Sequence, residues 1–279
     1  MIRPVPNRVA IAAIRRFEIG HARTDQDLVA VEAPLAIELR HAQSPERRAL
    51  GVFMRTPGDD RDLVRGLLYT EGLIRSLSEV SDMAFHPAGD RPETAEVVLE
   101  PTIDLAAIDS RLLAASSACG LCGRLSVDGL DVLARRAIAA HPLLVPPSTI
   151  LSLSAALRDR QAVFAETGGL HAAGLFDAAG ALHVIREDVG RHNAVDKVVG
   201  AALERGWLPA TNLLLAVSGR VAFEIVQKAW LAGIAVVVAI SAPTTLAIDL
   251  ARDAGVTLIG FARGDSLNIY THEQRVSGT

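Results

Sequence analysis

The chain has 279 residues, of which 50% are hydrophobic, 22% charged and only 4% aromatic. These proportions are those of a globular α/β protein, and they exclude a collagen-like, low-complexity or intrinsically disordered chain. The formal net charge of -4 argues against duplex nucleic acid as a partner, because such binding draws on clustered positive charge.

The length also exceeds that of a typical single domain, so we expect two domains. Near the N-terminus, the apolar run Val9–Ile14 is too short for a signal peptide, and it leads into Arg15-Arg16 without a cleavage site. The most apolar segment, Ala232–Ile240, is far shorter than the ~20 residues that span a bilayer. We therefore expect a cytoplasmic protein that does not enter a membrane.

The first half of the chain is rich in predicted strands. Apolar and polar residues partly alternate between turn residues in Ala12–Phe17, Leu28–Leu39, Leu50–Arg55, Val80–Phe85 and Ala95–Leu99. One helix interrupts them, because the segment Thr56-Pro57-Gly58-Asp59-Asp60 supplies a cap and early acidic residues. Leucines then recur at helical spacing until Glu71-Gly72 ends the helix.

Two weaker helical patterns, at 105–115 and 127–140, flank a segment of small residues, Ser116–Arg124, which we expect to be a mobile loop. The prolines from Pro142 to Pro147 break the chain, and Ser148 is predicted to cap a helix over 149–160. We place the domain boundary here, with an N-terminal α+β domain over 1–141 and a second domain over 142–279.

The second half alternates regularly between strands and helices. Strands are predicted at Leu170–Phe176, Ala181–Ile185, Leu213–Val217, Ala235–Ile240 and Thr257–Phe261, and helices at 191–204, 220–231 and 244–253. Asp177-Ala178-Ala179-Gly180 predicts a hairpin turn, and the later strand-helix-strand units predict parallel pairing. A hairpin followed by βαβαβ indicates a three-layer α/β/α domain, so the fold class is α/β.

The two cysteines of the chain, Cys119 and Cys122, form a C-x-x-C motif between glycines. A structural zinc site needs four ligands and here lacks a second cysteine pair, so we expect no metal. A thioredoxin-like dithiol would sit at a strand-to-helix junction, which these flanks do not resemble. The remaining interpretation is a nucleophilic thiol that carries sulfur as a persulfide, aided by the positive charge of nearby Arg124.

A second cluster of ionisable residues runs from Arg186 to Lys197. It is either a capped helix with a solvated face or an anion site in which Arg191, His192 and Lys197 take part. His171, just before the hairpin, is more simply a core histidine.

Small polar residues follow the predicted parallel strands. Ser218-Gly219-Arg220 and Ser241 stand where the carboxyl ends of two strands meet, the usual place of a nucleotide or phosphate site in a parallel α/β sheet. The same residues could simply begin the following helices.

Several of these motifs together resemble the FdhD/NarQ family. They are C-G-L-C-G-R at 119–124, R-E-D-V-G-R-H-N-A-V-D-K at 186–197, S-G-R at 218–220, S-A-P-T at 241–244, and residues 56–60 with Glu71-Gly72. The resemblance spans most of the chain. The twelve-residue string is highly specific, whereas a bare C-x-x-C is only moderately so.

Members of that family are accessory proteins for formate dehydrogenase that take sulfur from a cysteine desulfurase and pass it to the molybdenum cofactor. The resemblance implies a sulfurtransferase with the persulfide on Cys119 and Cys122 as the second motif cysteine. It also implies a homodimer and a C-terminal domain similar to cytidine deaminases. The cofactor, bis-molybdopterin guanine dinucleotide, would be cargo rather than a tightly bound group, held at Phe261, Ala262, Arg263, Gly264, Asp265 and Ser266.

Zinc deamination itself is disfavoured, because that chemistry needs H-x-E followed by P-C-x-x-C. No histidine of this chain is followed two residues later by glutamate. Two other functions stay open. One is a non-enzymatic chaperone that binds the guanine-bearing cofactor or the apo-enzyme, and the other is a dithiol oxidoreductase.

Overall fold

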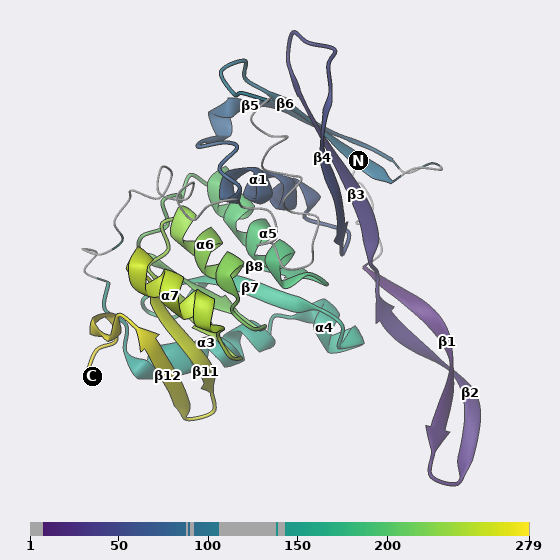
Figure 1. The fold of residues 1–279 in the computed structure, drawn as a ribbon. Coiled ribbons are helices and arrows are strands. Elements are labelled where there is room, and N and C mark those ends of the chain that lie inside the picture. Colours follow the sequence, from purple (N-terminus) through teal and green to yellow (C-terminus); the bar gives the residue numbers. More distant parts are fainter. Residues whose placement is uncertain (1–7, 88, 90–91, 106–137, 139–142, 279) are drawn as a thin grey trace.

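The structure is a computed structural model, and it describes residues 8–87, 89, 92–105, 138 and 143–278. This part of the chain is a mixed α/β molecule with a two-stranded, a four-stranded and a six-stranded sheet (Figure 1). Within the described ranges, no helix has both the length and the apolar character needed to cross a membrane.

The four-stranded sheet has the order β4-β3-β6-β5, and helix α1 covers one of its faces. Its elements are β3 (Ala33–His41), β4 (Arg48–Arg55), α1 (Asp60–Thr70), the short 3₁₀ helix η1 (Leu77–Glu79), β5 (Val80–His86) and β6 (Glu93–Leu99). Leucines of α1 and inward-facing residues of the strands form one hydrophobic core. The predicted helical cap is wrong: Asp59 has a left-handed conformation (φ 55°) and caps nothing, because its carboxylate pairs with Arg8.

A hairpin arm, made of β1 (Val9–Glu18) and β2 (His21–Ala30), extends away from the body (Figure 1). Its strands pair in register from Val9 with Ala30 to Glu18 with His21. The predicted single strand Leu28–Leu39 is therefore wrong. It is divided at Val31 and Glu32, because β2 pairs with β1 in the arm whereas β3 pairs with β4 and β6 in the body.

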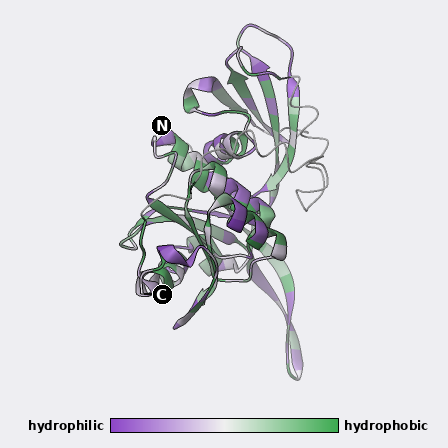
Figure 2. Cartoon of the chain, turned by 60° about the vertical axis from the view of Figure 1, so that its left-hand side comes forward, coloured by the Kyte–Doolittle hydropathy of each residue, from purple (hydrophilic) through white to green (hydrophobic). Residues whose placement is uncertain are grey.

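The six-stranded sheet has the order β12-β11-β10-β9-β7-β8. Its strands are β7 (His171–Asp177), β8 (Leu182–Asp188), β9 (Leu213–Val217), β10 (Val236–Ala239), β11 (Thr257–Arg263) and β12 (Ser266–Thr271). The predicted hairpin, β7 with β8, and the predicted parallel pairing of β9, β10 and β11 are confirmed. Every residue of β10 is buried, as expected of a central parallel strand, and this sheet is largely green in Figure 2.

Helices cover both faces of this sheet. On one face lie α5 (Arg191–Glu204), α6 (Phe223–Leu231) and α7 (Thr245–Ala254), and on the other lies α3 (Pro147–Arg158) (Figure 1). A short helix, α4 (Ala162–Thr167), lies beside the arm, and a 3₁₀ turn, η4 (Glu273–Arg275), lies near the C-terminus. These are the three layers that the sequence predicts; the similarity to cytidine deaminases stays a prediction. The predicted cap at Ser148 is wrong, since α3 already begins at Pro147, a residue suited to a first helical turn.

Helices α1 and α5 join the two sheets by crossing at two glycines. A Cβ atom on Gly66 would lie 1.8 Å from the carbonyl oxygen of Asp196, and one on Gly200 would lie 1.9 Å from that of Asp62. No larger residue fits at either position while the backbones stay in place. The N-terminal sheet is thus held against α5, the helix whose first half is formed by residues 191–197 of the motif.

Part of the sequence prediction lies outside the described residues. This holds for the helices at 105–115 and 127–140 and for the loop 116–124 with both cysteines. The division into domains over 1–141 and 142–279 stays a prediction. Most of the N-terminal core residues belong to the four-stranded sheet and α1, but Leu203 of α5 also contributes to that core.

Candidate functional site

The carboxyl ends of β9, β10 and β11 lie next to one another at one edge of the six-stranded sheet. Hydrogen bonding continues past the strands: the Ile240 amide donates to the Val217 carbonyl at 3.2 Å, and the Phe261 amide donates to the Ser241 carbonyl at 3.1 Å. This strand-end edge therefore brings the predicted residues Ser218, Gly219, Arg220 and Ser241 close to the start of the Phe261–Ser266 segment.

The loop after β9 is longer than the sequence predicts, because α6 begins at Phe223 and not at residue 220. The Ala172 amide donates to the Ser218 hydroxyl oxygen at 2.9 Å, which leaves the hydroxyl hydrogen of Ser218 to donate elsewhere. Gly219 is buried, whereas Arg220 is exposed. The loop is thus fixed by backbone contacts and presents Arg220 to solvent.

The segment Phe261–Ser266 is a hairpin connection between β11 and β12. The predicted end of the last strand at Phe261 is wrong, since β11 continues to Arg263, which pairs with Ser266 of β12. Ala262 is buried, and Arg263, Gly264, Asp265 and Ser266 are exposed. Phe261 has a left-handed backbone (φ 53°), and the Arg263 guanidinium lies 6.0 Å from the centre of its ring. This arrangement offers an aromatic ring, a cation and free polar groups side by side.

The first turn of α5 reaches the same edge from the β8 side. A Cβ on Gly219 would lie 3.2 Å from Nδ1 of His171 and 3.6 Å from Cβ of Arg191, so the loop after β9 lies against both residues. The prediction of a core histidine is wrong, because His171 is only partly buried. The sequence predicts an anion at Arg191 and His192 and a phosphate or nucleotide at Gly219 and Arg220, whereas His171 was not among the predicted binding residues.

Both histidines at this edge are held neutral. Burial lowers the pKa of His192 to about 4, and the positive charges of Arg191 and Lys228 act in the same direction. Burial, followed by the charges of Arg191 and Arg220, also lowers the pKa of His171. Glu224 lies 3.7 Å from Nε2 of His192, too far for a hydrogen bond, and does not offset these effects.

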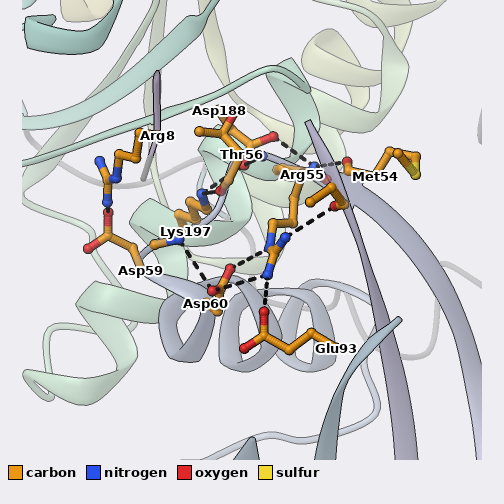
Figure 3. A network of polar contacts seen from close by, with 12 residues as sticks. Arg8, Met54, Arg55, Thr56, Asp59, Asp60, Glu93, Asp188 and Lys197 are labelled. Atoms are coloured by element: carbon orange, nitrogen blue, oxygen red, sulfur yellow. Dashed lines mark hydrogen bonds and ion pairs between the residues drawn. The ribbon is translucent and has the colours of Figure 1, made fainter. Parts of the chain in front are cut away.

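The acidic residues of the motif at 186–197 have a structural role. Asp188 and Lys197 form a fully buried ion pair at 2.7 Å, and Lys197 also donates to the Thr56 carbonyl at 2.8 Å (Figure 3). The Thr56 amide donates to Asp188 at 3.1 Å. Lys197 is therefore not available to an external anion, contrary to one of the two predicted interpretations, because its side chain faces the interior.

Two further contacts connect the motif to the N-terminal part. Arg186 pairs with Asp62 of α1 at 2.7 Å. Asp196 is fully buried; it accepts from Lys228 and from the Thr70 hydroxyl, and burial raises its pKa. Beside this network, Arg55 is almost fully buried between Asp60 and Glu93 (Figure 3). The motif at 186–197 thus positions α5 against α1 and against the segment before α1 that contains Thr56.

Cys119 and Cys122 lie outside the described residues. Among the residues that the structure does describe, no group of three or more histidine, cysteine, aspartate or glutamate side chains is arranged to hold a metal ion. Two hollows, of about 420 and 460 Å³, are lined by residues such as His41 and Trp207 and do not include the strand-end edge.

The chain is similar to known proteins over nearly its whole length. A model of the FdhD/NarQ family matches residues 30–277. A relative from Saccharolobus solfataricus, described as "Sulfur carrier protein FdhD", is 44% identical over 268 residues and covers 94% of this chain and 98% of its own. Another of that description, from Nocardia farcinica, is 43% identical over 268 residues, with 94% and 92% covered.

A solved structure from Desulfotalea psychrophila, described as a formate dehydrogenase accessory protein, superposes with a TM-score of 0.72. It covers 96% of this chain and 99% of its own at 24% identity, so it supports the fold alone.

Proposed function

The chain belongs to the FdhD/NarQ family, and from this we propose that it is a sulfur carrier that serves formate dehydrogenase. The observation that carries the proposal is the 44% identity to a relative named as a sulfur carrier, over 94% of this chain and 98% of that relative. The C-x-x-C motif, which contains both cysteines of the sequence, supports it by supplying a thiol for the sulfur.

The proposed chemistry is a transfer of one sulfur atom. The Cys119 thiolate attacks the terminal sulfur of a persulfide on a cysteine desulfurase; the bond between the donor's two sulfur atoms breaks, and the donor cysteine leaves as a thiolate. Cys119 then holds the atom as a persulfide until the acceptor takes it. Arg124 would favour the thiolate by its positive charge, and Cys122 would accept or modulate the persulfide.

The proposed acceptor is the molybdenum cofactor, bis-molybdopterin guanine dinucleotide, bound as cargo. The Phe261–Ser266 hairpin, exposed from Arg263 to Ser266, offers an aromatic ring, an arginine and a carboxylate for a guanine nucleotide. Ser218, Gly219, Arg220 and Ser241 lie along the same edge. A homodimer, a cytoplasmic location and a C-terminal domain similar to cytidine deaminases belong to this proposal as well.

Intact mass spectrometry after incubation with a cysteine desulfurase and cysteine tests the carrier. We expect a gain of one sulfur mass in the wild type and in Cys122→Ala, and none in Cys119→Ala. Absence of the adduct from all three proteins would reject sulfur carriage and favour a cofactor chaperone. A reversible Cys119–Cys122 disulfide that turns over on protein substrates would instead favour a dithiol oxidoreductase.

A further inference from the structure

The hairpin arm, β1 with β2, has two faces of different chemistry. Residues that pair across an antiparallel ladder point to the same face, and successive residues of a strand point to opposite faces. One face, which we call the apolar arm face, consists of Val9 with Ala30, Ile11 with Leu28, Ala13 with Gln26, Arg15 with Thr24, and Phe17 with Ala22. The charged arm face consists of Ala10 with Val29, Ala12 with Asp27, Ile14 with Asp25, Arg16 with Arg23, and Glu18 with His21.

The ion pairs of the arm lie on the charged arm face. Arg16 pairs with Asp25 at 2.8 Å, and Arg23 lies 3.4 Å from Asp25 and 3.6 Å from Glu18. The apolar arm face carries no carboxylate. Its one cation, Arg15, forms no ion pair with any of the described residues. The two faces are thus divided as on a sheet that has one face in water and the other covered.

The apolar arm face is nevertheless exposed in the single chain. Phe17, Ile11 and Leu28 are 80%, 67% and 40% exposed. The body touches the arm at its base, where α4 lies against β2 and a Cβ on Gly169 would lie 3.3 Å from that of Ala30 (Figure 1). A two-stranded hairpin without a cover is at best marginally stable in water, and a long exposed apolar face marks an interaction surface. The arm therefore needs a cover that the described part of the chain does not supply.

We propose that the apolar arm face packs on the same face of a second copy of this chain. The middle pair of the face is Ala13 with Gln26, so a two-fold axis at Ala13 brings two arms together in opposite directions. Phe17 near the tip of one arm then lies on the base of the other, where the face consists of the smaller Val9 and Ala30. The small Ala13 lets the two arms approach closely at the centre.

The charges of the chain also favour a second copy over an unrelated partner. In this arrangement the part of each arm that carries Arg15 lies toward the base of the other arm, beside α4. Glu166 of α4 is exposed and forms no ion pair with any of the described residues. A cation toward one end of the face and a carboxylate beside the other end complement each other between arms that run in opposite directions.

The size of the face sets the strength to expect. Strands of ten residues give an arm about 34 Å long and about 10 Å wide, so two faces together hide roughly 700 Å². A stable dimer needs about 1,200 Å², so an interface made by the arms alone belongs to the weak class. We therefore expect a dimer that dissociates on dilution. A homodimer is part of the proposed function, whereas the choice of this face as its interface rests on the arm.

Sedimentation of the full-length protein over a dilution series tests the face. Leu28 and Val29 are neighbours with nearly equal exposure, 40% and 39%, on opposite faces of the arm. Leu28→Thr and Phe17→Thr therefore remove apolar surface from the proposed interface, and Val29→Thr is the matched control. Threonine keeps the preference for a strand, and circular dichroism checks that each variant keeps its fold.

We expect the wild type to dimerise, and Leu28→Thr and Phe17→Thr each to raise the dimer dissociation constant at least about tenfold, because every dimer loses two apolar side chains. Val29→Thr should stay within about twofold of the wild type. A wild type that is monomeric at every concentration, or a dimer that Leu28→Thr and Val29→Thr weaken equally, would overturn the proposal.

Cross-linking tests whether the occupant is a second copy in the proposed register. In a Cys119→Ser/Cys122→Ser background, Ala13→Cys places one thiol at the proposed two-fold axis, and Ala12→Cys places it on the charged arm face. A short bismaleimide should join two chains through Ala13→Cys and not through Ala12→Cys, and labelling with a monofunctional maleimide corrects for thiol accessibility. Equal cross-linking of the two variants, or none, would reject this arrangement of the arms.

Sulfur loading of the wild-type protein is a separate measurement that keeps the two proposals apart. If Cys119 gains no sulfur while the chains still cross-link through Ala13→Cys, the proposed function fails and the arm interface stands. If Cys119 is loaded while the wild type stays monomeric, the arm interface is overturned and sulfur carriage stands.

Discussion

Replacing Gly66 with alanine should destabilise the fold, although helix propensity alone predicts the opposite. In an exposed helix interior, alanine is better than glycine by about 0.8–1 kcal/mol. Here the added Cβ would lie 1.8 Å from the carbonyl oxygen of Asp196, so α1 and α5 must separate by about 1.5 Å to reach an ordinary contact. Such overpacking costs about 1–3 kcal/mol. The separation also stretches the 2.7 Å hydrogen bond from Thr70 to Asp196, which adds about 1 kcal/mol.

We therefore expect a net loss of about 1–3 kcal/mol once the gain in helix propensity is subtracted, which for a chain of this size lowers Tm by roughly 2–12 °C. Urea unfolding and calorimetry measure both quantities. Gly89→Ala is the control, because a Cβ there meets no atom within 4 Å. Gly200→Ala should behave like Gly66→Ala, and the double variant should cost less than their sum, since the first change already separates the helices. A rise in the Tm of Gly66→Ala would refute the close crossing.

Three further outcomes follow from the buried polar groups. Lys197→Met leaves Asp188 buried without a cation and should cost about 3–5 kcal/mol in urea unfolding, part of which Asp188→Asn in the same chain restores. His192 has a folded pKa of about 4, below its unfolded value of 6.5, so the stability it contributes is complete above pH 6.5 and is lost as the pH falls toward 4. This loss amounts to about 3 kcal/mol and should be absent from the pH dependence of His192→Gln. Glu187→Ala frees two amides at the start of α4 and should speed their hydrogen exchange, corresponding to about 1–2 kcal/mol; unchanged exchange there would contradict this contact.

The regular second half of the chain could be predicted well because its signals are local. The bounds of α5 and β9 coincide with the predicted ranges 191–204 and 213–217. Gly190 and Gly206 lie on either side of α5, and β9 is an unbroken apolar run. Strand β12 was not predicted. Only two residues separate it from the end of β11, so this short connection was interpreted as the end of the last strand and not as a turn into another one.

The hairpin arm was harder to predict because the rest of the described chain, α4 apart, leaves most of it exposed. Ile11 and Phe17 are 67% and 80% exposed, so burial imposes little periodicity on β1 and β2. Period-two alternation predicts a strand only when one face is hidden from water. Because burial gives β2 little periodicity, the sequence prediction joined the end of β2 and most of β3 into one strand, Leu28–Leu39.

The sequence also could not show which side chains of the motif at 186–197 face inward. Lys197 and His192 lie five positions apart on one helix, and both are basic. Only the tertiary structure shows that Lys197 reaches Asp188 in the interior whereas His192 lies at the strand-end edge. Helical periodicity places residues on faces but does not say which face meets the neighbouring α1.

The inward-facing and outward-facing residues of the motif at 186–197 have different roles. Its inward residues Glu187, Asp188, Asp196 and Lys197 have their hydrogen-bonding capacity used by the fold, and a purely structural segment would need nothing more. The outward pair is different, since Arg191 and His192 each keep a buried nitrogen without a partner at a cost of about 1–3 kcal/mol apiece. These two unpaired nitrogens lie at the start of α5, where the sequence predicts an anion site at Arg191 and His192. The inward half of the motif acts as the rigid support that holds the outward half in place at the strand-end edge.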